Sequence, residues 1–144
     1  MQIWVTLQNI KNGQIKNTYH KTVYGIGYYG DGDGKYTARI NGIKTEEFIK
    51  WFSMFNRCYD EKYQEKQPTY IGCSVSEEFW NFQNFAEWYN KKKYVCNYPL
   101  ELDKDLLYES NKIYSPHKCC LLPKEINNGI NYHRHDVMFM SKLY

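Results

Sequence analysis

The sequence predicts an α+β fold, in which β-rich residues 1–44 precede a helical segment over residues 45–98. Short apolar runs separated by glycine-rich turns are typical of β-hairpins, and they fill the first third of the chain. Aromatic side chains at helical spacing fill the middle third. A chain of 144 residues is long enough to bury a core as one compact domain.

The N-terminal residues predict a β-hairpin or a three-stranded meander. Ile3-Trp4-Val5 is a short apolar run, and residues 35–40 alternate in polarity as a strand does. Asn41-Gly42 then supplies the positive φ angles of a tight hairpin turn. Residues 30–34, rich in Gly and Asp, fit a turn, because they lack the further acidic ligands of a calcium loop and the Gly-Lys-Ser/Thr sequence of a phosphate loop.

Two amphipathic helices are expected in the middle of the chain. The first spans about residues 45–60 and has Thr45 as its N-cap. The second begins near Ser74 or Ser76, because Ser74-Val75-Ser76-Glu77 has the spacing of a capping box. It ends at Lys91-Lys92-Lys93, which suit the negative end of the helix dipole and are expected to be a solvated cap. The aromatic residues expected to form the core are Phe48, Trp51, Phe52, Phe55, Tyr59, Phe79, Phe82, Phe85, Trp88 and Tyr89.

The overall charge permits nucleic-acid binding without requiring it. The formal net charge is +3 and the isoelectric point is about 8.5, so any basic patch must be local. The same balance argues against a mimic of DNA, which needs a strongly acidic surface. The sequence contains no recognisable signal peptide and no apolar run of membrane-spanning length. We therefore expect a protein of the reducing cytoplasm that has free thiols and does not bind a membrane.

The five cysteines form an irregular set without a Cys-x-x-Cys pair, so a zinc ribbon is not supported. Cys58, Cys73 and Cys119 are expected to be small buried packing residues. The alternative is a structural zinc site that these thiols share with His117.

A series of motifs between about residues 24 and 128 is similar to a known family. The motifs are Tyr24-Gly25-Ile26-Gly27, Trp51-x-x-Met54-x-x-Arg57-Cys58-Tyr59, Tyr70-x-x-Cys73-x-Val75, Trp80-x-Phe82-x-x-Phe85-x-x-Trp88, Leu102-Asp103-Lys104-Asp105-Leu106, Asn111-Lys112-x-Tyr114-Ser115-Pro116-x-x-Cys119 and Pro123-x-x-Ile126-Asn127. Together they resemble phage-encoded proteins labelled HNH endonuclease-like or AP2/HNH-like DNA-binding proteins. The resemblance implies a degenerate ββα finger and a tail in residues 99–144, packed with the rest of the chain as one domain. It also implies that the protein acts in the cytoplasm of a bacterial host.

The resemblance places the HNH catalytic positions on this sequence. In an HNH finger, a His activates water, an Asn orients that His, and an Asp together with a final His or Asn holds a divalent cation. Here the Asp of the motif is retained as Asp103, and Asn127 occupies the last position. Lys104 replaces the general base, and Lys118 replaces the middle Asn. A lysine with an ordinary pKa of about 10.4 is an ammonium at neutral pH and cannot accept a proton from water.

We therefore expect an inactive nuclease site that needs no cofactor and binds nucleic acid. Mg²⁺ or Mn²⁺ would bind only if Asp103 and Asn127 preserve part of the metal site. The residues expected to contact phosphates of DNA or another nucleic acid are Lys104, Lys112, Lys118 and Lys124. The N-terminal hairpin would then supply a groove-reading sheet, as AP2-like modules do.

Two alternatives to simple nucleic-acid binding stay open. If the alignment is shifted by one residue, His117 becomes a catalytic candidate, and the protein would be a metal-dependent nicking endonuclease. In the other alternative, a small phage protein uses this fold to bind and inhibit a host enzyme or defence nuclease, as an anti-CRISPR protein does. Exposed tyrosines would suit such a protein interface, because aromatic anchors dominate binding energy there.

Overall fold

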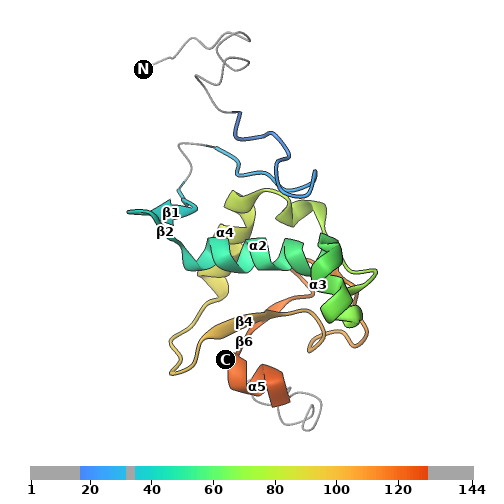
Figure 1. Cartoon of the computed structure of the whole chain (residues 1–144). Coiled ribbons are helices and arrows are strands. Elements are labelled where there is room, and N and C mark those ends of the chain that lie inside the picture. Colours follow the sequence, from blue (N-terminus) through green and yellow to red (C-terminus); the bar gives the residue numbers. More distant parts are fainter. Residues whose placement is uncertain (1–16, 32–34, 130–144) are drawn as a thin grey trace, which may run out of the picture.

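The computed structural model describes residues 17–31 and 35–129, and these residues have the α+β architecture that the sequence predicts (Figure 1). In chain order the elements are β1 (Arg39–Ile40), β2 (Ile43–Lys44), α2 (Glu46–Tyr59), α3 (Glu61–Lys66), η1 (Pro68–Tyr70), β3 (Ser74–Val75), η2 (Glu77–Phe79), α4 (Phe82–Lys92), β4 (Leu100–Asp103), β5 (Ile113–Tyr114), β6 (Cys120–Pro123) and α5 (Lys124–Gly129). The strands form the separate pairs β1–β2, β3–β5 and β4–β6. The expected strand at Ile3-Trp4-Val5 lies outside the described residues, as do residues 32–34. Within the described ranges, no helix has the length and apolar character needed to cross a lipid bilayer.

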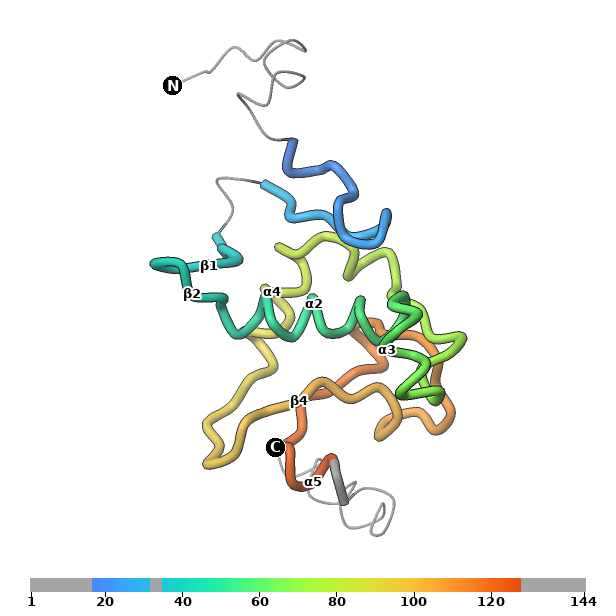
Figure 2. Tube along the Cα trace, viewed as in Figure 1, coloured from blue at the N-terminus to red at the C-terminus, as the bar shows by residue number. Residues whose placement is uncertain are grey.

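Helices α2 and α4 pack against each other at the centre of the fold (Figure 2). Trp51 of α2 and Phe82 of α4 are buried, and the centroids of their rings are 5.3 Å apart. The indole Nε1 of Trp51 donates a 2.8 Å hydrogen bond to the carbonyl oxygen of Phe79. Phe52 and Tyr59 lie only partly buried at the margin of this core. The predicted aromatic core is therefore confirmed, and burial of its rings is the main stabilising contribution to the α2–α4 pair.

Of the predicted hairpin or three-stranded meander, the described residues contain only the short hairpin β1–β2. The expectation of a β-rich segment is otherwise wrong for them, because residues 17–31 and 35–38 form turns, coil and isolated bridges. Asn41 and Gly42 form its two-residue turn with φ angles of 51° and 78°, as a type I′ turn requires. Thr45 occupies the N-cap position of α2, as expected, but its hydroxyl does not cap the helix. That hydroxyl instead donates a 2.8 Å hydrogen bond to the carbonyl oxygen of Thr37, which ties the base of the hairpin to the start of α2.

The prediction that the second helix begins near Ser74 or Ser76 is wrong, because α4 begins at Phe82. Ser74 lies in β3, which pairs in parallel with β5, and Ser76 precedes the 3₁₀ turn η2 without capping it. The side chain of Asn81 caps α4 instead, accepting a 2.9 Å hydrogen bond from the backbone N–H of Gln83. Strand pairing with a segment distant in sequence thus overrides the local capping-box spacing.

The C-terminal part of the described chain contains the antiparallel pair β4–β6 followed by α5, as in the ββα unit that the resemblance implies, but β5 lies between these strands in the chain and pairs with β3. Leu102 of β4 lies opposite Leu121 of β6, and both side chains enter the main core. The opposite face of this pair is covered by α5, which Figure 1 shows beneath β4 and β6. There Leu122 and Leu106 form a small second cluster with Ile126. The finger therefore shares one face with the domain core and carries a small core of its own on the other.

Candidate nucleic-acid interface

Asp103, at the Asp position of the resemblance, closes the turn that follows β4. Its Oδ2 atom accepts hydrogen bonds from the backbone N–H groups of Asp105 at 3.0 Å and Leu106 at 2.6 Å. Burial raises the pKa of Asp103, although the hydrogen bond from Leu106 acts in the opposite direction. The carboxylate thus holds its own turn in place, which is a common use of Asp after a strand.

Replacing Asp103 by Asn is expected to stabilise the protein more at neutral pH than at acidic pH. A carboxyl group with a raised folded-state pKa binds its proton more tightly in the folded chain than in the unfolded chain. Its contribution to stability is therefore largest at low pH and is lost as pH rises through the folded pKa. Asn does not ionise and can still accept the two backbone hydrogen bonds. Urea unfolding of both proteins between about pH 4 and about pH 7 measures the difference in stability. If the stability of the wild type instead rises relative to that of the variant as pH increases, burial is not the dominant influence on the pKa of Asp103.

Lys104, which the resemblance assigns to the general-base position, lies inside the protein. Its side chain is only 6% exposed, and its Nζ atom is 2.9 Å from both carboxylate oxygens of Asp105. The ring of Tyr114 packs nearby, with its centroid 6.0 Å from the ammonium. A buried ammonium that already has a carboxylate partner is poorly placed to bind a phosphate arriving from solvent. Lys104 is therefore not part of the interface that we propose below.

Arg57 of α2 is a second cation in this interior region. Its Nη1 atom donates to the carbonyl oxygen of Leu102 at 3.2 Å and to the hydroxyl of Tyr114 at 3.4 Å. Its guanidinium carbon lies 5.6 Å from the centroid of the Tyr70 ring. Burial raises the pKa of Tyr114, so this hydroxyl stays protonated and neutral. These motif residues thus join α2 to the start of the finger, a structural role that their spacing in the sequence did not indicate.

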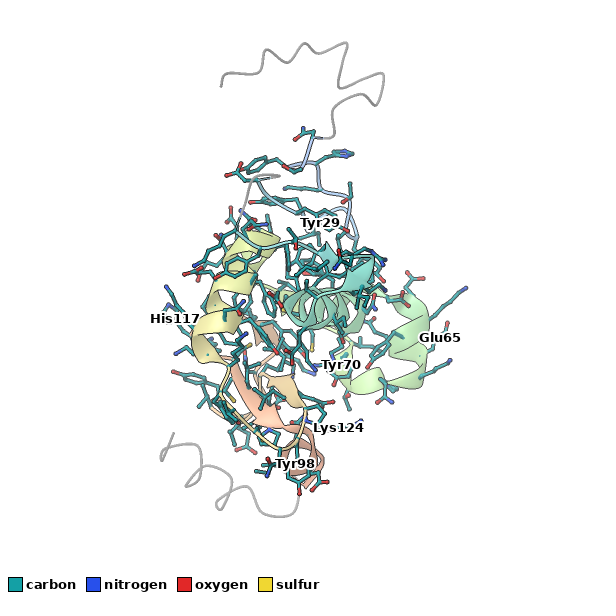
Figure 3. All side chains as sticks on the ribbon, turned by 90° about the vertical axis from the view of Figure 1, so that its left-hand side faces the viewer. Tyr29, Glu65, Tyr70, Tyr98, His117 and Lys124 are labelled. Carbon is teal, nitrogen blue, oxygen red and sulfur yellow. The ribbon has the colours of Figure 1, made fainter. Side chains whose placement is uncertain are left out.

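Lys124 and Asn127 lie at the far end of the finger. Lys124 is exposed at the start of α5, and Nδ2 of Asn127 donates a 3.1 Å hydrogen bond to Oε2 of Glu101. Lys118 precedes β6 whereas Lys124 follows it, so this four-residue strand separates the two lysines. Figure 3 likewise shows Lys124 well away from His117, which lies beside α4. The structure therefore does not gather the four predicted lysines at one site.

The side chains at the predicted metal positions, Asp103 and Asn127, both have hydrogen-bond partners within the protein. Asp103 binds backbone amides of its own turn, and Asn127 binds Glu101. Across the part of the chain that the structure describes, no three His, Cys, Asp or Glu side chains are arranged to hold a metal ion.

The three cysteines of the motifs are packing residues, as predicted. Cys58, Cys73 and Cys119 are all buried free thiols. Burial raises the pKa of Cys58 and of Cys119 to about 12, which keeps both sulfur atoms protonated and unreactive. His117 is exposed, so the described side chains do not form the alternative zinc site.

Lys112 and Lys118 are exposed on the segments before and after β5. Nζ of Lys112 donates a 3.0 Å hydrogen bond to the carbonyl oxygen of Thr69. Nζ of Lys118 lies 5.7 Å from the centroid of the Tyr108 ring, and Tyr108 is 53% exposed. His117 is exposed in the same turn as Lys118. This turn therefore presents a cation, an imidazole and an adjoining aromatic ring to solvent.

A hydrogen bond from α4 places further lysines beside this turn. Nε1 of Trp88 donates to the carbonyl oxygen of Pro116 at 3.1 Å. Lys92 follows Trp88 by one helical turn and lies on the same side of α4, and Lys93 is the C-cap residue. The sequence predicts only a solvated cap at Lys91-Lys92-Lys93, because the segment that contacts α4 through Trp88 is 28 residues later in the chain. Neither local spacing nor composition signals that contact.

Glu87 connects the end of α4 to Lys35. Its carboxylate lies 3.4 Å from Nζ of Lys91 and 3.7 Å from Nζ of Lys35, and it accepts a 2.6 Å hydrogen bond from the Tyr36 hydroxyl. The hydrogen bond from Tyr36 and the two lysines lower the pKa of Glu87. One carboxylate thus holds two ammonium groups close together. We refer to the exposed cations that this arrangement and the Trp88 contact bring together as the basic strip: Lys35, Lys91, Lys92, Lys93 and Lys118.

In comparisons with protein-family models, with curated proteins and with solved structures, nothing matches this chain. The basic strip is therefore the feature on which a functional proposal rests.

Proposed function

We propose that the protein binds nucleic acid through the basic strip and does not cleave it. The observation that carries the proposal is the hydrogen bond between Trp88 and Pro116, which brings the lysines at the end of α4 beside Lys118. Cations from segments far apart in the sequence then share one surface, although the net charge of the whole chain is only +3. Clustered lysines neutralise neighbouring phosphates and release their counterions, which is the main source of affinity that does not depend on base sequence.

Tyr108 supports the same proposal. Its ring is more than half exposed, and Lys118 lies over it. Aromatic faces beside cations are common where proteins contact nucleic acids, because an exposed base can stack on the ring while the cation binds a phosphate. The contact with Lys118 also restricts the ammonium to the neighbourhood of the ring, so less conformational freedom is lost when a phosphate binds.

The absence of cleavage is proposed from the surroundings of Lys104 and Asp103. An ammonium paired with Asp105 has no lone pair with which to activate water. Asp103 is engaged by two backbone amides. An HNH reaction needs a general base at the position of Lys104, and a lysine ammonium cannot act as one.

Reversing two charges of the basic strip is expected to weaken DNA binding strongly. If the strip contacts about four phosphates, the affinity of the wild type falls roughly 100-fold between about 50 mM and about 200 mM salt. The variant Lys92→Glu/Lys118→Glu should bind at least about tenfold more weakly at the lower salt concentration. The slope of log affinity against log salt concentration should also fall by the contribution of about two phosphate contacts. Fluorescence anisotropy with labelled duplex and single-stranded DNA measures both quantities.

The matched control is Lys62→Glu/Lys66→Glu, which makes the same change of net charge on α3. Lys62 and Lys66 are exposed and line a hollow with Asn56 of α2, so they sample a different surface. This control should retain affinity within about threefold, since only long-range electrostatics is altered. Equal weakening by both variants would show that net charge, and not the strip, determines binding. A wild type that binds neither form of DNA at low salt would contradict the proposal and leave inhibition of another protein as the stronger hypothesis.

The same preparations test the absence of cleavage. Supercoiled plasmid incubated with the protein and Mg²⁺ or Mn²⁺ is expected to stay intact. Nicking that disappears in the His117→Ala variant would establish the nicking-endonuclease alternative and overturn this part of the proposal.

A further inference from the structure

The β1–β2 hairpin has one apolar face and one basic face, and both are exposed. Ile40 lies directly opposite Ile43, and their side chains are 61% and 74% exposed. Arg39 lies opposite Lys44 at the next position along the ribbon, so their side chains point to the other face. Two large apolar side chains next to each other at the tip of a small hairpin are unfavourable in water and suggest a surface that another molecule covers.

The hairpin is held firmly at its base and is free at its tip. The Thr45 hydroxyl donates to Thr37 at 2.8 Å, and the backbone N–H of Thr45 donates to Ala38 at 2.9 Å. The Asn41-Gly42 turn fixes the other end in a tight type I′ geometry. Figures 1 and 2 show β1 and β2 extending outward beyond the packed helices. The isoleucines are thus presented on a preorganised projection.

The charged residues within the hairpin itself are cations, which favour an anionic occupant. Residues 35–45 contain three cations, Lys35, Arg39 and Lys44, and no acidic residue, whereas Glu46 and Glu47 follow in the first turn of α2 and Lys35 pairs with Glu87. Lys35 also belongs to the basic strip, because it shares Glu87 with Lys91. A molecule bound along the strip therefore continues toward the hairpin. An occupant that offers phosphates to the cations and an apolar interior to the isoleucines fits this combination.

We propose that the hairpin inserts Ile40 and Ile43 as an apolar wedge between base pairs of duplex DNA, from the minor groove, and kinks the duplex. This inference rests on the proposed nucleic-acid binding and names the form of nucleic acid and the mode of contact. Each strand of the ribbon has only two residues, too few to lay a row of side chains along a groove, so the tip makes the contact. Isoleucine is among the side chains that proteins insert between base steps. Arg39 and Lys44 lie one position further from the tip on the other face of the ribbon, and Nη1 of Arg39 donates a 3.1 Å hydrogen bond to the carbonyl oxygen of Gly42. Only Asn41 at the turn offers an amide to a base edge, so little sequence preference is expected.

The test compares Ile40→Thr/Ile43→Thr with the wild type on a duplex of about 25 base pairs that carries a donor and an acceptor dye at its ends. Threonine keeps the β-branched shape that suits a strand, so the hairpin itself should persist. Wild type is expected to raise energy transfer between the dyes, as a kink of roughly 20–90° brings the ends together. The variant should bind about tenfold more weakly and leave energy transfer at the level of free DNA. The control variant Ile71→Thr/Ile113→Thr alters two exposed isoleucines outside the hairpin and should bind and bend as the wild type does.

Each outcome bears on the wedge separately from the proposed function. If Lys92→Glu/Lys118→Glu weakens binding while Ile40→Thr/Ile43→Thr binds and bends as the wild type does, nucleic-acid binding stands and the wedge is overturned. The wedge is also overturned if the wild type binds duplex without a change in energy transfer. Light scattering tests whether a second copy of the chain is the occupant instead. A wild-type dimer that becomes a monomer in the Ile40→Thr/Ile43→Thr variant would show that a second copy covers these isoleucines and would overturn the wedge. If the wild type binds no DNA at low salt, both proposals fall.

Discussion

The variant Asp105→Asn is expected to lower the free energy of unfolding by about 2–3 kcal/mol, because it leaves the buried Lys104 ammonium without its counter-charge. Lys104 is 6% exposed and contacts both carboxylate oxygens of Asp105. Removing one partner of a buried ion pair typically costs about 3–5 kcal/mol. The side chain of Asp105 is 43% exposed, so some water reaches the ammonium and the loss falls at the lower end. Urea unfolding followed by tryptophan fluorescence measures the change.

The matched control for this prediction removes the other partner. Lys104→Met replaces the ammonium with an apolar side chain of similar length, and it should alter stability by less than about 1 kcal/mol. The double variant Lys104→Met/Asp105→Asn should then recover most of the stability lost in Asp105→Asn. If Lys104→Met is as damaging as Asp105→Asn, the pair contributes net stability and the desolvation argument is wrong.

Lys104→Met also separates a structural from a ligand-binding role for this lysine. Because Lys104 is buried, the variant is expected to bind DNA within about twofold of the wild type. A large loss of affinity, with stability unchanged, would instead restore Lys104 to the phosphate-contact residues.

The burial of Lys104 could have been predicted from the sequence. Leu100 and Leu102 alternate with Glu101 and Asp103, and in a strand the same alternation directs the next residue, Lys104, to the side of the leucines. The resemblance implies a catalytic position at Lys104, whereas this periodicity implies a buried one. The aromatic stripes of α2 and α4 were predicted correctly for the same physical reason, since a period of 3.6 residues is a local property of the chain.

The basic strip could not be predicted in this way, because it depends on contacts between distant segments. The turn that carries Lys118 reaches α4 through Trp88, and Lys35 reaches α4 through Glu87. Each contact joins residues whose separation in the chain no spacing rule describes. The capping-box spacing at Ser74 was misleading for a related reason, since the parallel pairing of β3 with β5 is also a distant contact.

The second large effect is expected at Gly30, where substitution by Ala should lower the free energy of unfolding by about 3 kcal/mol. Gly30 has a φ angle of +78°, which costs an alanine roughly 1 kcal/mol or more. A Cβ atom added there would also run directly into Oδ1 of Asn81 and come within 2.8 Å of Cγ of Gln83. That Asn81 oxygen caps α4, so relieving the clash sacrifices a cap worth about 1 kcal/mol. The remaining loss comes from overpacking against Gln83.

Gly72→Ala isolates the backbone contribution to this effect. Gly72 has a similar φ angle of +84°, and an added Cβ atom would meet nothing within 4 Å. Gly72→Ala should therefore cost only about 1 kcal/mol, and the difference between the two variants in urea unfolding measures the clash with the Asn81 cap. Equal losses would mean that Asn81 moves aside without a penalty and that α4 does not depend on its cap. A larger loss in Gly30→Ala instead ties the segment of residues 17–31 to the start of α4, the helix whose other end carries three lysines of the basic strip.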